Sequence, residues 1–165
     1  DKLTEGAACT ALLASDKMNW DQPLLIVNSD QFIKWDSNQF MYRMIHSDID
    51  GGILTFQVSS KDDKRWSYVK LDSNGFVIEV KEKEPISDLA TVGVYYFKTA
   101  RMFIHYANQM IEANDRVNNE FYLCPEYGYM IKDKKKIITM NAEKMYGTGD
   151  PESLAHFLKE YRGPI

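Results

Sequence analysis

Residues 24–30 read Leu-Leu-Ile-Val-Asn-Ser-Asp, and they carry the main indication of the fold. Its four consecutive apolar residues, without alternation, are typical of a parallel strand that is buried on both faces. Asp30 then lies just beyond the carboxyl end of that strand. Open α/β sheets bind ligands at this position, because the loops diverge there and leave a crevice. The stretch therefore favours an α/β domain in which Asp30 is a candidate ligand for a divalent cation; the alternative is that Asp30 only caps the next turn.

Predicted helices and strands alternate toward both ends of the chain and surround one hairpin. We expect helices at 4–17, from 37 to the pair Gly51-Gly52, and at 99–113, 125–131 and 151–161, with further strands at 53–58, 66–71, 76–80, 91–97 and 137–140. Thr4 and Ser37 are expected N-caps, and Asn74-Gly75 predicts the turn of the hairpin. This order predicts a single domain over residues 1–165, with a mixed sheet that helices cover on both faces.

The composition excludes several classes of protein. The 165 residues are 44% apolar and 27% charged, as in an ordinary globular domain. The formal net charge is -4 and the lysines are interleaved with acids, so no nucleic-acid partner is expected. The longest apolar run, residues 23–27, is far shorter than the roughly 18 residues that a membrane helix needs. Cys9 and Cys124 are isolated, which predicts neither a zinc site nor a disulfide and fits a reducing cytoplasm.

Five segments, in order along the chain, resemble motifs of one family. Residues 5–8, Glu-Gly-Ala-Ala, resemble a Gly-Ala/Thr-Ala helix start, and residues 27–30, Val-Asn-Ser-Asp, resemble a Leu-Gly-Asp-Asn strand end. Residues 63–69 are similar to Asp-Pro-x-Arg-Tyr-Gly-Val, residues 79–83 to a Glu-Glu-Lys motif, and residues 90–97 to an Ala-x-x-Gly-Leu-Tyr strand. The family is that of the sugar nucleotidyltransferases, also called nucleoside-diphosphate-sugar pyrophosphorylases. The resemblance implies a Rossmann-like mixed sheet flanked by helices, the nucleotide-diphospho-sugar transferase fold.

The end of the chain resembles one branch of that family. Residues 146–154, Tyr-Gly-Thr-Gly-Asp-Pro-Glu-Ser-Leu, are similar to the Tyr-Gly-x-Gly-Thr-Pro-Glu-Asp-Leu pattern of members from capsule loci. This implies a role in surface or capsular polysaccharide synthesis.

The resemblance implies nucleotidyl transfer, in which a phosphorylated acceptor attacks the α-phosphorus of a nucleoside triphosphate and pyrophosphate leaves. Asp30 would hold Mg²⁺, Lys83 would neutralise the acceptor phosphate, and Glu82 would accept hydrogen bonds from acceptor hydroxyls. The further substrate contacts that the resemblance implies are Gly6 beside the base, Asn28, Trp66, Ser67, Gly93 and Glu120. Two alternatives remain open: residues 81–84 are a solvated charged turn, and Trp66 belongs to the core.

The sequence departs from the family pattern in two places. The Gly-rich loop that holds the triphosphate in the family would lie upstream of residue 1, and Gly147 stands where the family has a second metal-binding Asp. Asp150 is the candidate replacement. Without the opening strands we expect an exposed sheet edge, covered either by the missing N-terminal segment or by a second copy in a homodimer.

Two other functions fit the same fold. A GT-A-type (family 2-like) glycosyltransferase would want an Asp-x-Asp pair, whereas Asn28-Ser29-Asp30 offers one acid. A non-catalytic binding or assembly module would keep the scaffold without the phosphate loop. The sequence selects neither the nucleotide nor the acceptor.

Overall fold

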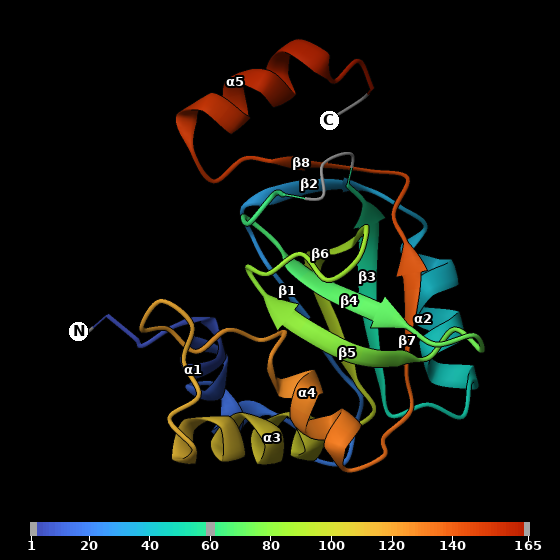
Figure 1. Cartoon of the computed structure of the whole chain (residues 1–165), viewed down its shortest axis with the longest axis vertical. Coiled ribbons are helices and arrows are strands. Elements are labelled where there is room, and N and C mark those ends of the chain that lie inside the picture. Colours follow the sequence, from blue (N-terminus) through green and yellow to red (C-terminus); the bar gives the residue numbers. More distant parts are fainter. Residues whose placement is uncertain (1–2, 59–61, 164–165) are drawn as a thin grey trace.

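The computed structural model describes residues 3–58 and 62–163 and has a mixed α/β architecture (Figure 1). Its helices are α1 Ala7–Leu12, the 3-10 helix η1 Ser15–Lys17, α2 Ser37–His46, α3 Ala100–Glu112, α4 Glu126–Lys132 and α5 Pro151–Glu160. Its strands are β1 Leu24–Val27, β2 Gln31–Lys34, β3 Gly51–Gln57, β4 Ser67–Leu71, β5 Val77–Glu82, β6 Leu89–Phe97, β7 Ile137–Asn141 and β8 Lys144–Gly147. The predicted mixed sheet is confirmed: its order is β5-β4-β6-β3-β7 with β1 beside β6, and the β3–β7 pair is parallel while the other pairs are antiparallel.

Strand β6 lies at the centre of the sheet and separates two cores. Val92, Val94 and Tyr96 point into a core that α2 covers, and Tyr95 and Phe97 point into a core that α1, α3 and α4 cover (Figure 1). The alternation follows from the two-residue period of a strand. The predicted apolar face of the helix after β6 is confirmed, since α3 buries Phe103, Tyr106, Ala107 and Met110. The sheet is therefore covered on both faces, as expected.

Strand β1 has the predicted bounds but not the predicted environment. It runs antiparallel to β6, from Leu24 opposite Phe97 to Val27 opposite Val94, and it is only half-buried, with Val27 49% exposed. A short apolar run by itself specifies neither the direction of a strand nor its burial on both faces, so the expectation of a fully buried parallel strand was wrong. Within the described residues, β6 is the one strand that pairs with β1.

The first two predicted helices have different ends in the structure. Gly6, with φ 125°, occupies the N-cap position of α1, so the helix begins later than Thr4 and stops at Leu12. In α2 the cap is Asp36, whose carboxylate accepts the Gln39 N–H at 2.9 Å, and Ser37 is the first helical residue. Gly51-Gly52 opens β3 instead of closing α2. A β-carbon at Gly52 would lie 2.1 Å from the Met44 sulfur, so the small residue lets the strand pack against α2.

The hairpin is confirmed, and a second small sheet was not predicted. The Asp72 carboxylate accepts the N–H groups of Asn74 and Phe76, and Gly75 takes φ 84° in the turn. The unpredicted pair β2–β8 is antiparallel and carries α5 (Figure 1). An aromatic cluster joins these parts, with ring centroids 4.5 to 6.4 Å apart: Phe32, Tyr146, Phe157 and Tyr161. Through this pairing, the C-terminal segment lies beside β2, the strand that follows β1 in the chain.

No helix in the described part of the chain is both long and apolar enough to cross a membrane.

Candidate active site

A cavity of about 450 Å³ lies where the ends of β1, β4 and β5 and the middle of β6 meet the segment after β8. All but two of the predicted site residues line it: Asn28, Asp30, Trp66, Ser67, Glu82, Lys83, Gly93 and Asp150. They come from segments far apart in the sequence. The fold therefore brings the candidate metal ligand, the candidate phosphate-binding lysine and the expected acceptor contacts to one cavity.

Asp30 presents a free carboxylate to this cavity. It lies between β1 and β2, and its backbone carbonyl accepts the Thr148 N–H at 2.8 Å. Among the described residues, no group donates a hydrogen bond to the carboxylate or forms an ion pair with it. An exposed carboxylate on a short loop after a strand is a hard oxygen ligand of the kind that Mg²⁺ prefers.

Asp150 lines the same cavity but uses its carboxylate as a helix cap. One oxygen accepts the Ser153 N–H at 2.9 Å and the other accepts the Ser153 hydroxyl at 2.6 Å, which together begin α5. These hydrogen bonds lower the pKa of Asp150, and the charge of Arg65 lowers it further. Asp150 is thus ionised but already engaged.

The two acids fit Mg²⁺ in an open site, not a closed protein cage. Within the described ranges, no group of three His, Cys, Asp or Glu side chains is arranged to hold a metal ion. Mg²⁺ commonly takes one or two carboxylates and completes its shell with water and substrate phosphates. Asp30 fits that mode as the principal protein ligand, and Asp150 fits it less well.

Glu82 and Ser67 form a hydrogen-bonded pair at one wall. They face each other across the β4–β5 pair, and the Ser67 hydroxyl donates to the Glu82 carboxylate at 2.5 Å. The pKa of Glu82 is raised above its ordinary value because the carboxyl group is buried. The hydrogen bond from Ser67 and the charge of the Lys83 ammonium offset only part of this rise. Deeper in the same wall, the hydroxyls of Thr91 and Tyr95 lie 2.9 Å apart. This wall offers several hydroxyl and carboxyl groups to a polar ligand.

Lys83 follows directly on β5 and takes a left-handed backbone conformation, with φ 57°. Its N–H donates to the Trp66 carbonyl at 2.9 Å, and its Nζ donates to the Tyr122 hydroxyl at 2.8 Å. The hydrogen bond to Tyr122 is the largest cause that raises the pKa of Lys83. Lys83 is therefore a cation, and the alternative of a merely solvated turn does not describe it.

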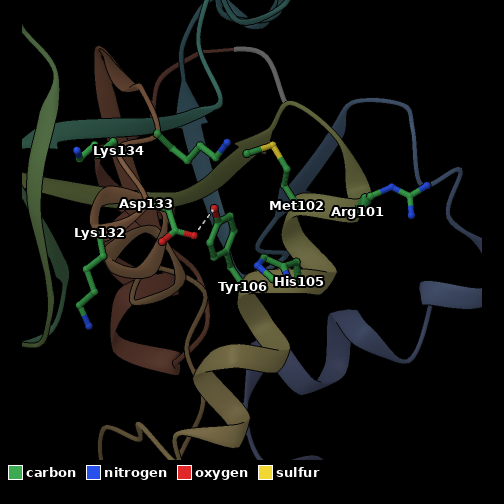
Figure 2. Close-up of a pocket in the computed structure, with 8 residues that line it drawn as sticks. Arg101, Met102, His105, Tyr106, Lys132, Asp133 and Lys134 are labelled. Carbon is green, nitrogen blue, oxygen red and sulfur yellow. Dashed lines mark hydrogen bonds between the residues drawn. The ribbon is translucent and has the colours of Figure 1, made fainter.

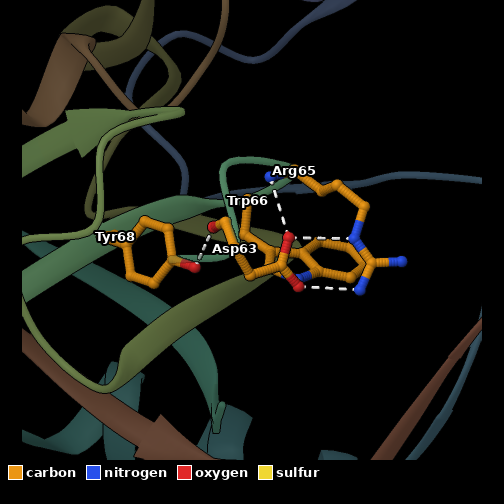
Figure 3. A network of polar contacts seen from close by, with 4 residues as sticks. All are labelled: Asp63, Arg65, Trp66 and Tyr68. Atoms are coloured by element: carbon orange, nitrogen blue, oxygen red, sulfur yellow. Dashed lines mark hydrogen bonds and ion pairs between the residues drawn. The ribbon is translucent and has the colours of Figure 1, made fainter. Parts of the chain in front are cut away.

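Trp66 forms both a wall of the cavity and a contact with the core. Its ring meets Phe56 edge-on at 5.4 Å, and its Nε1 donates to the Asp63 carboxylate at 2.9 Å (Figure 3). The same carboxylate receives two bonds from Arg65, at 2.9 and 2.7 Å, which lower the pKa of Asp63 to about 2. The Arg65 guanidinium lies 5.2 Å from the Trp66 ring centroid. The network holds a cation and an aromatic face side by side at the cavity.

Asn28 is held against the backbone of Gly93. The Asn28 N–H donates to the Gly93 carbonyl at 2.9 Å, and Gly93 takes φ 73°. A β-carbon at Gly93 would lie 2.5 Å from the Asn28 side-chain nitrogen and 2.8 Å from that of Gln31. Glycine is required here for both the backbone conformation and the close approach.

Two predicted residues do not line the cavity. Gly6 packs against the backbone of Phe121, where an added β-carbon would lie 2.5 Å from the Phe121 carbonyl oxygen, and the next residue, Ala7, lines the cavity instead. Glu120 is exposed and lies outside the lining. Its carboxylate still interacts electrostatically with the site, because its negative charge is one of the causes that raise the pKa of Lys83.

Sequence reasoning missed Arg65, Tyr122 and Gln31, which also line the cavity. Arg65 belongs to the segment 63–69 that resembles a family motif, so the sequence contained an indication that it could lie at the site. The only indication for Tyr122 in the sequence was that it lies two residues after the candidate residue Glu120. Gln31 begins β2, a strand that was not predicted.

A larger cavity, of about 630 Å³, lies between α3 and the end of α4 and contains none of the predicted residues (Figure 2). It is rich in basic residues, but they do not converge. Arg101 pairs with Asp21 at 2.8 Å, and Figure 2 shows it pointing away from Lys132. Tyr106 donates to Asp133 at 3.1 Å across the cavity. Cations after a helix C-terminus are favoured by the helix dipole alone, so this cavity is the weaker candidate.

Comparison with known proteins agrees with the fold. The chain matches the family described as Nucleotidyl transferase over residues 1–162. Among solved structures it is similar to a nucleoside-diphosphate-sugar pyrophosphorylase from Vibrio cholerae, with 23% identity and a TM-score of 0.74 over 96% of this chain and 67% of that one. A Bacillus anthracis protein described as a glucose-1-phosphate thymidylyltransferase, in complex with sucrose, gives 16% identity and a TM-score of 0.73 over 99% of this chain and 65% of that one.

A UDP-glucose pyrophosphorylase in complex with UDP-glucose gives 16% identity and a TM-score of 0.72, over 96% of this chain and 64% of that one. The chain thus spans about two thirds of the length of the structures that it matches. No curated protein matches the sequence. The predicted nucleotide-diphospho-sugar transferase fold and the resemblance to sugar nucleotidyltransferases are confirmed. The chain belongs to the nucleotidyl transferase family.

Proposed function

We propose that this protein transfers a nucleotidyl group from a nucleoside triphosphate to a sugar phosphate or another phosphorylated small molecule, with release of pyrophosphate. The observation that carries the proposal is the convergence of Asp30 and Lys83 on one cavity, although they come from opposite ends of the β1 to β5 segment. A carboxylate free to take a cation and a lysine held as a cation are suited to neutralise the charge of reacting phosphates. The membership in the family supports the same reaction.

The reaction needs positioning and charge neutralisation more than proton transfer. An oxygen of the acceptor phosphate attacks the α-phosphorus, the bond to the β-phosphate oxygen breaks, and pyrophosphate leaves. Mg²⁺, when bound by Asp30, would neutralise charge on the triphosphate. Lys83 holds the acceptor phosphate, and the Arg65 guanidinium, which is paired with Asp63, lies at the same cavity. Asn28 and Gln31, packed on Gly93, lie beside Asp30 in the lining and bind the nucleotide part.

The acceptor occupies the side of the cavity formed by Trp66, Ser67 and Glu82. The Glu82 carboxyl group accepts hydrogen bonds from acceptor hydroxyls, and the Trp66 ring packs against the acceptor. The similar structures are described as a nucleoside-diphosphate-sugar pyrophosphorylase, a glucose-1-phosphate thymidylyltransferase and a UDP-glucose pyrophosphorylase, which supports a sugar phosphate as the acceptor. The C-terminal pattern at residues 146–154 supports a place in surface or capsular polysaccharide synthesis. We place the reaction in the cytoplasm because Cys9 and Cys124 are both free.

The test is pyrophosphate release with Mg²⁺ across a panel of nucleoside triphosphates and phosphorylated acceptors. We expect one pair to react, and we expect Asp30→Asn and Lys83→Met each to lower kcat/KM by about 100-fold or more, since each removes a charge that stabilises the transition state. Asp16→Asn and Lys70→Met are matched controls, because both residues are exposed and neither lines the cavity.

Three results would contradict the proposal: no pyrophosphate from any pair, full activity in Asp30→Asn, or equal losses in the controls. Sugar transfer from a nucleotide sugar, with release of the nucleotide, would instead identify a glycosyltransferase.

A further inference from the structure

The backbone of Lys83 is strained and is held from outside its own strand. Of the described residues, five other than glycine have a positive φ, and three of these are asparagines, which tolerate that conformation. Lys83 is the one among the five that lines the candidate site. Strain of this kind persists only where neighbouring groups hold it in place, and it is concentrated at functional sites.

The groups that hold Lys83 come from two other segments. The Trp66 carbonyl fixes the Lys83 backbone through the 2.9 Å hydrogen bond. Tyr122 fixes the other end of the side chain, because its hydroxyl accepts a hydrogen bond from Nζ at 2.8 Å. The ammonium therefore has a defined position before any ligand binds.

Tyr122 is itself anchored by its neighbours. Phe121 and Leu123 are both buried in the core that α1, α3 and α4 cover, whereas Tyr122 between them is only half-buried and faces the cavity. The backbone of Phe121 is tied to the start of α1, since its N–H donates to the Glu5 carbonyl at 2.8 Å and its carbonyl accepts the Ala8 N–H at 3.0 Å. Two buried side chains and two backbone hydrogen bonds thus hold the backbone of Tyr122 in place beside the cavity.

We propose that Tyr122 is a positioning residue that holds the Lys83 ammonium at the cavity, ready for the phosphate of the acceptor. The inference rests on the proposed function, because it assigns Lys83 to that phosphate. A lysine side chain has four flexible bonds, and freezing them when the ligand binds costs affinity. Tyr122 removes that cost by ordering the side chain in the free protein. It acts through Lys83 and touches no reacting atom.

The chain contains a matched pair for a control. Lys132 lies 4.7 Å from the ring centroid of Tyr129, close to the separation of Lys83 from Tyr122, and the Tyr129 hydroxyl donates to Asp115 at 3.0 Å. Neither Tyr129 nor Lys132 lines the candidate site. Tyr129→Phe therefore removes a hydroxyl from a similar arrangement without touching the proposed chemistry.

The kinetic test compares Tyr122→Phe, which keeps the ring, with Tyr122→Leu, which removes it. We expect Tyr122→Phe to raise KM for the phosphorylated acceptor by about tenfold, the size expected for a lost hydrogen bond to a charged group. We expect Tyr122→Leu to raise it further, and KM for the nucleoside triphosphate to stay within about twofold in both, because the contact concerns the acceptor alone. An unchanged KM for the acceptor in both variants, or the same rise in Tyr129→Phe, would overturn the positioning role.

A second measurement does not need activity. Reductive methylation followed by mass spectrometry gives the rate at which each lysine reacts. We expect Lys83 to react more slowly than the exposed Lys70 in the unchanged protein, and faster in Tyr122→Phe than in Tyr129→Phe. If the unchanged protein releases no pyrophosphate, the proposed function fails and these rates alone decide the structural role. Equal Lys83 rates with and without the Tyr122 hydroxyl would overturn it.

Discussion

Gly149 lies directly against the carboxylate of Asp30. A β-carbon on Gly149 would be 2.8 Å from Oδ2 and 3.2 Å from Cβ of Asp30, distances at which one of the two residues must move. The Thr148 N–H, one residue earlier, donates to the Asp30 carbonyl at 2.8 Å. The position of the candidate metal ligand thus depends on a glycine in the segment that follows β8.

Gly149→Ala should therefore impair the site without unfolding the protein. The added methyl group displaces the Asp30 carboxylate, and a displacement of about 1 Å at a reacting centre costs up to about 100-fold in rate. We expect kcat/KM to fall by about 10- to 100-fold and the Mg²⁺ concentration for half-maximal activity to rise. Gly128→Ala is the control, because its new β-carbon would meet Val80 at an ordinary 3.5 Å. Equal activity in the two variants would show that Gly149 does not position Asp30.

Gly93 and Gly75 separate the cost of backbone strain from the cost of a clash. Both have a positive φ, 73° and 84°, but an added β-carbon meets Asn28 at 2.5 Å at Gly93 and nothing within 4 Å at Gly75. Gly75→Ala should cost about 1 kcal/mol of unfolding free energy, for the conformation alone. Gly93→Ala should cost about 2 kcal/mol more, by analogy with overpacking in a core. Denaturant unfolding of both variants measures the difference, and equal losses would contradict the contact with Asn28.

The lowered pKa of Asp63 predicts that the unfolding free energy falls at acid pH. Its hydrogen bonds to Arg65 lower its pKa from 3.8 to about 2 in the folded protein, so the folded state binds fewer protons than the unfolded state between these values. The stabilisation is present above about pH 4 and is lost as the pH falls toward 2. Because Arg65 is largely exposed, we expect about 1 kcal/mol rather than the full value of the shift.

Asp63→Asn should lower the unfolding free energy at pH 7 and have almost no effect at pH 2. Asp16→Asn, which breaks the exposed pair with Lys17, should cost less at either pH. A loss for Asp63→Asn that stays the same at pH 2 and pH 7 would assign the effect to packing and not to the charge.

The raised pKa of Glu126 predicts the opposite dependence of the unfolding free energy on pH. Its side chain is fully buried, neither carboxylate oxygen has a hydrogen-bond partner in the described part of the chain, and burial raises its pKa well above 4.5. The folded state therefore holds a proton that the unfolded state releases above about pH 4.5, and stability falls as the pH rises. Glu126→Gln should raise the unfolding free energy by about 2 kcal/mol at pH 8 and by much less at pH 4. Glu112→Gln, on the exposed side of α3, should change neither value.

The sequence predicted the parts of this protein that local patterns encode. Helical spacing identified α2 and α3, the Asn74-Gly75 turn identified the hairpin, and motif order placed Asp30 and Lys83 at the ends of strands that meet. The general rule for parallel strands does not explain the shared cavity, because β1 and β5 run in opposite directions in the sheet; the resemblance to the family motifs is what led us to expect it.

The features that were missed depend on contacts between distant segments. The direction of β1 is set by its pairing with β6, and β2 is a four-residue strand whose partner lies more than a hundred positions away. The use of the Asp150 carboxylate as a cap and the contact of Tyr122 with Lys83 likewise need the folded chain. Short strands and single side-chain contacts leave no periodic signal in a sequence.

A crystal structure of the protein with Mg²⁺, a non-hydrolysable analogue of the nucleoside triphosphate that reacts best, and its phosphorylated acceptor would show whether Asp30 and Lys83 act at one site. We expect the metal to contact Asp30 and the acceptor phosphate to lie within hydrogen-bonding distance of Lys83 Nζ, both in the cavity that Trp66 and Gly93 also line. Ligands bound instead in the basic cavity beside Tyr106 and Asp133, with Asp30 still free of metal, would contradict the account.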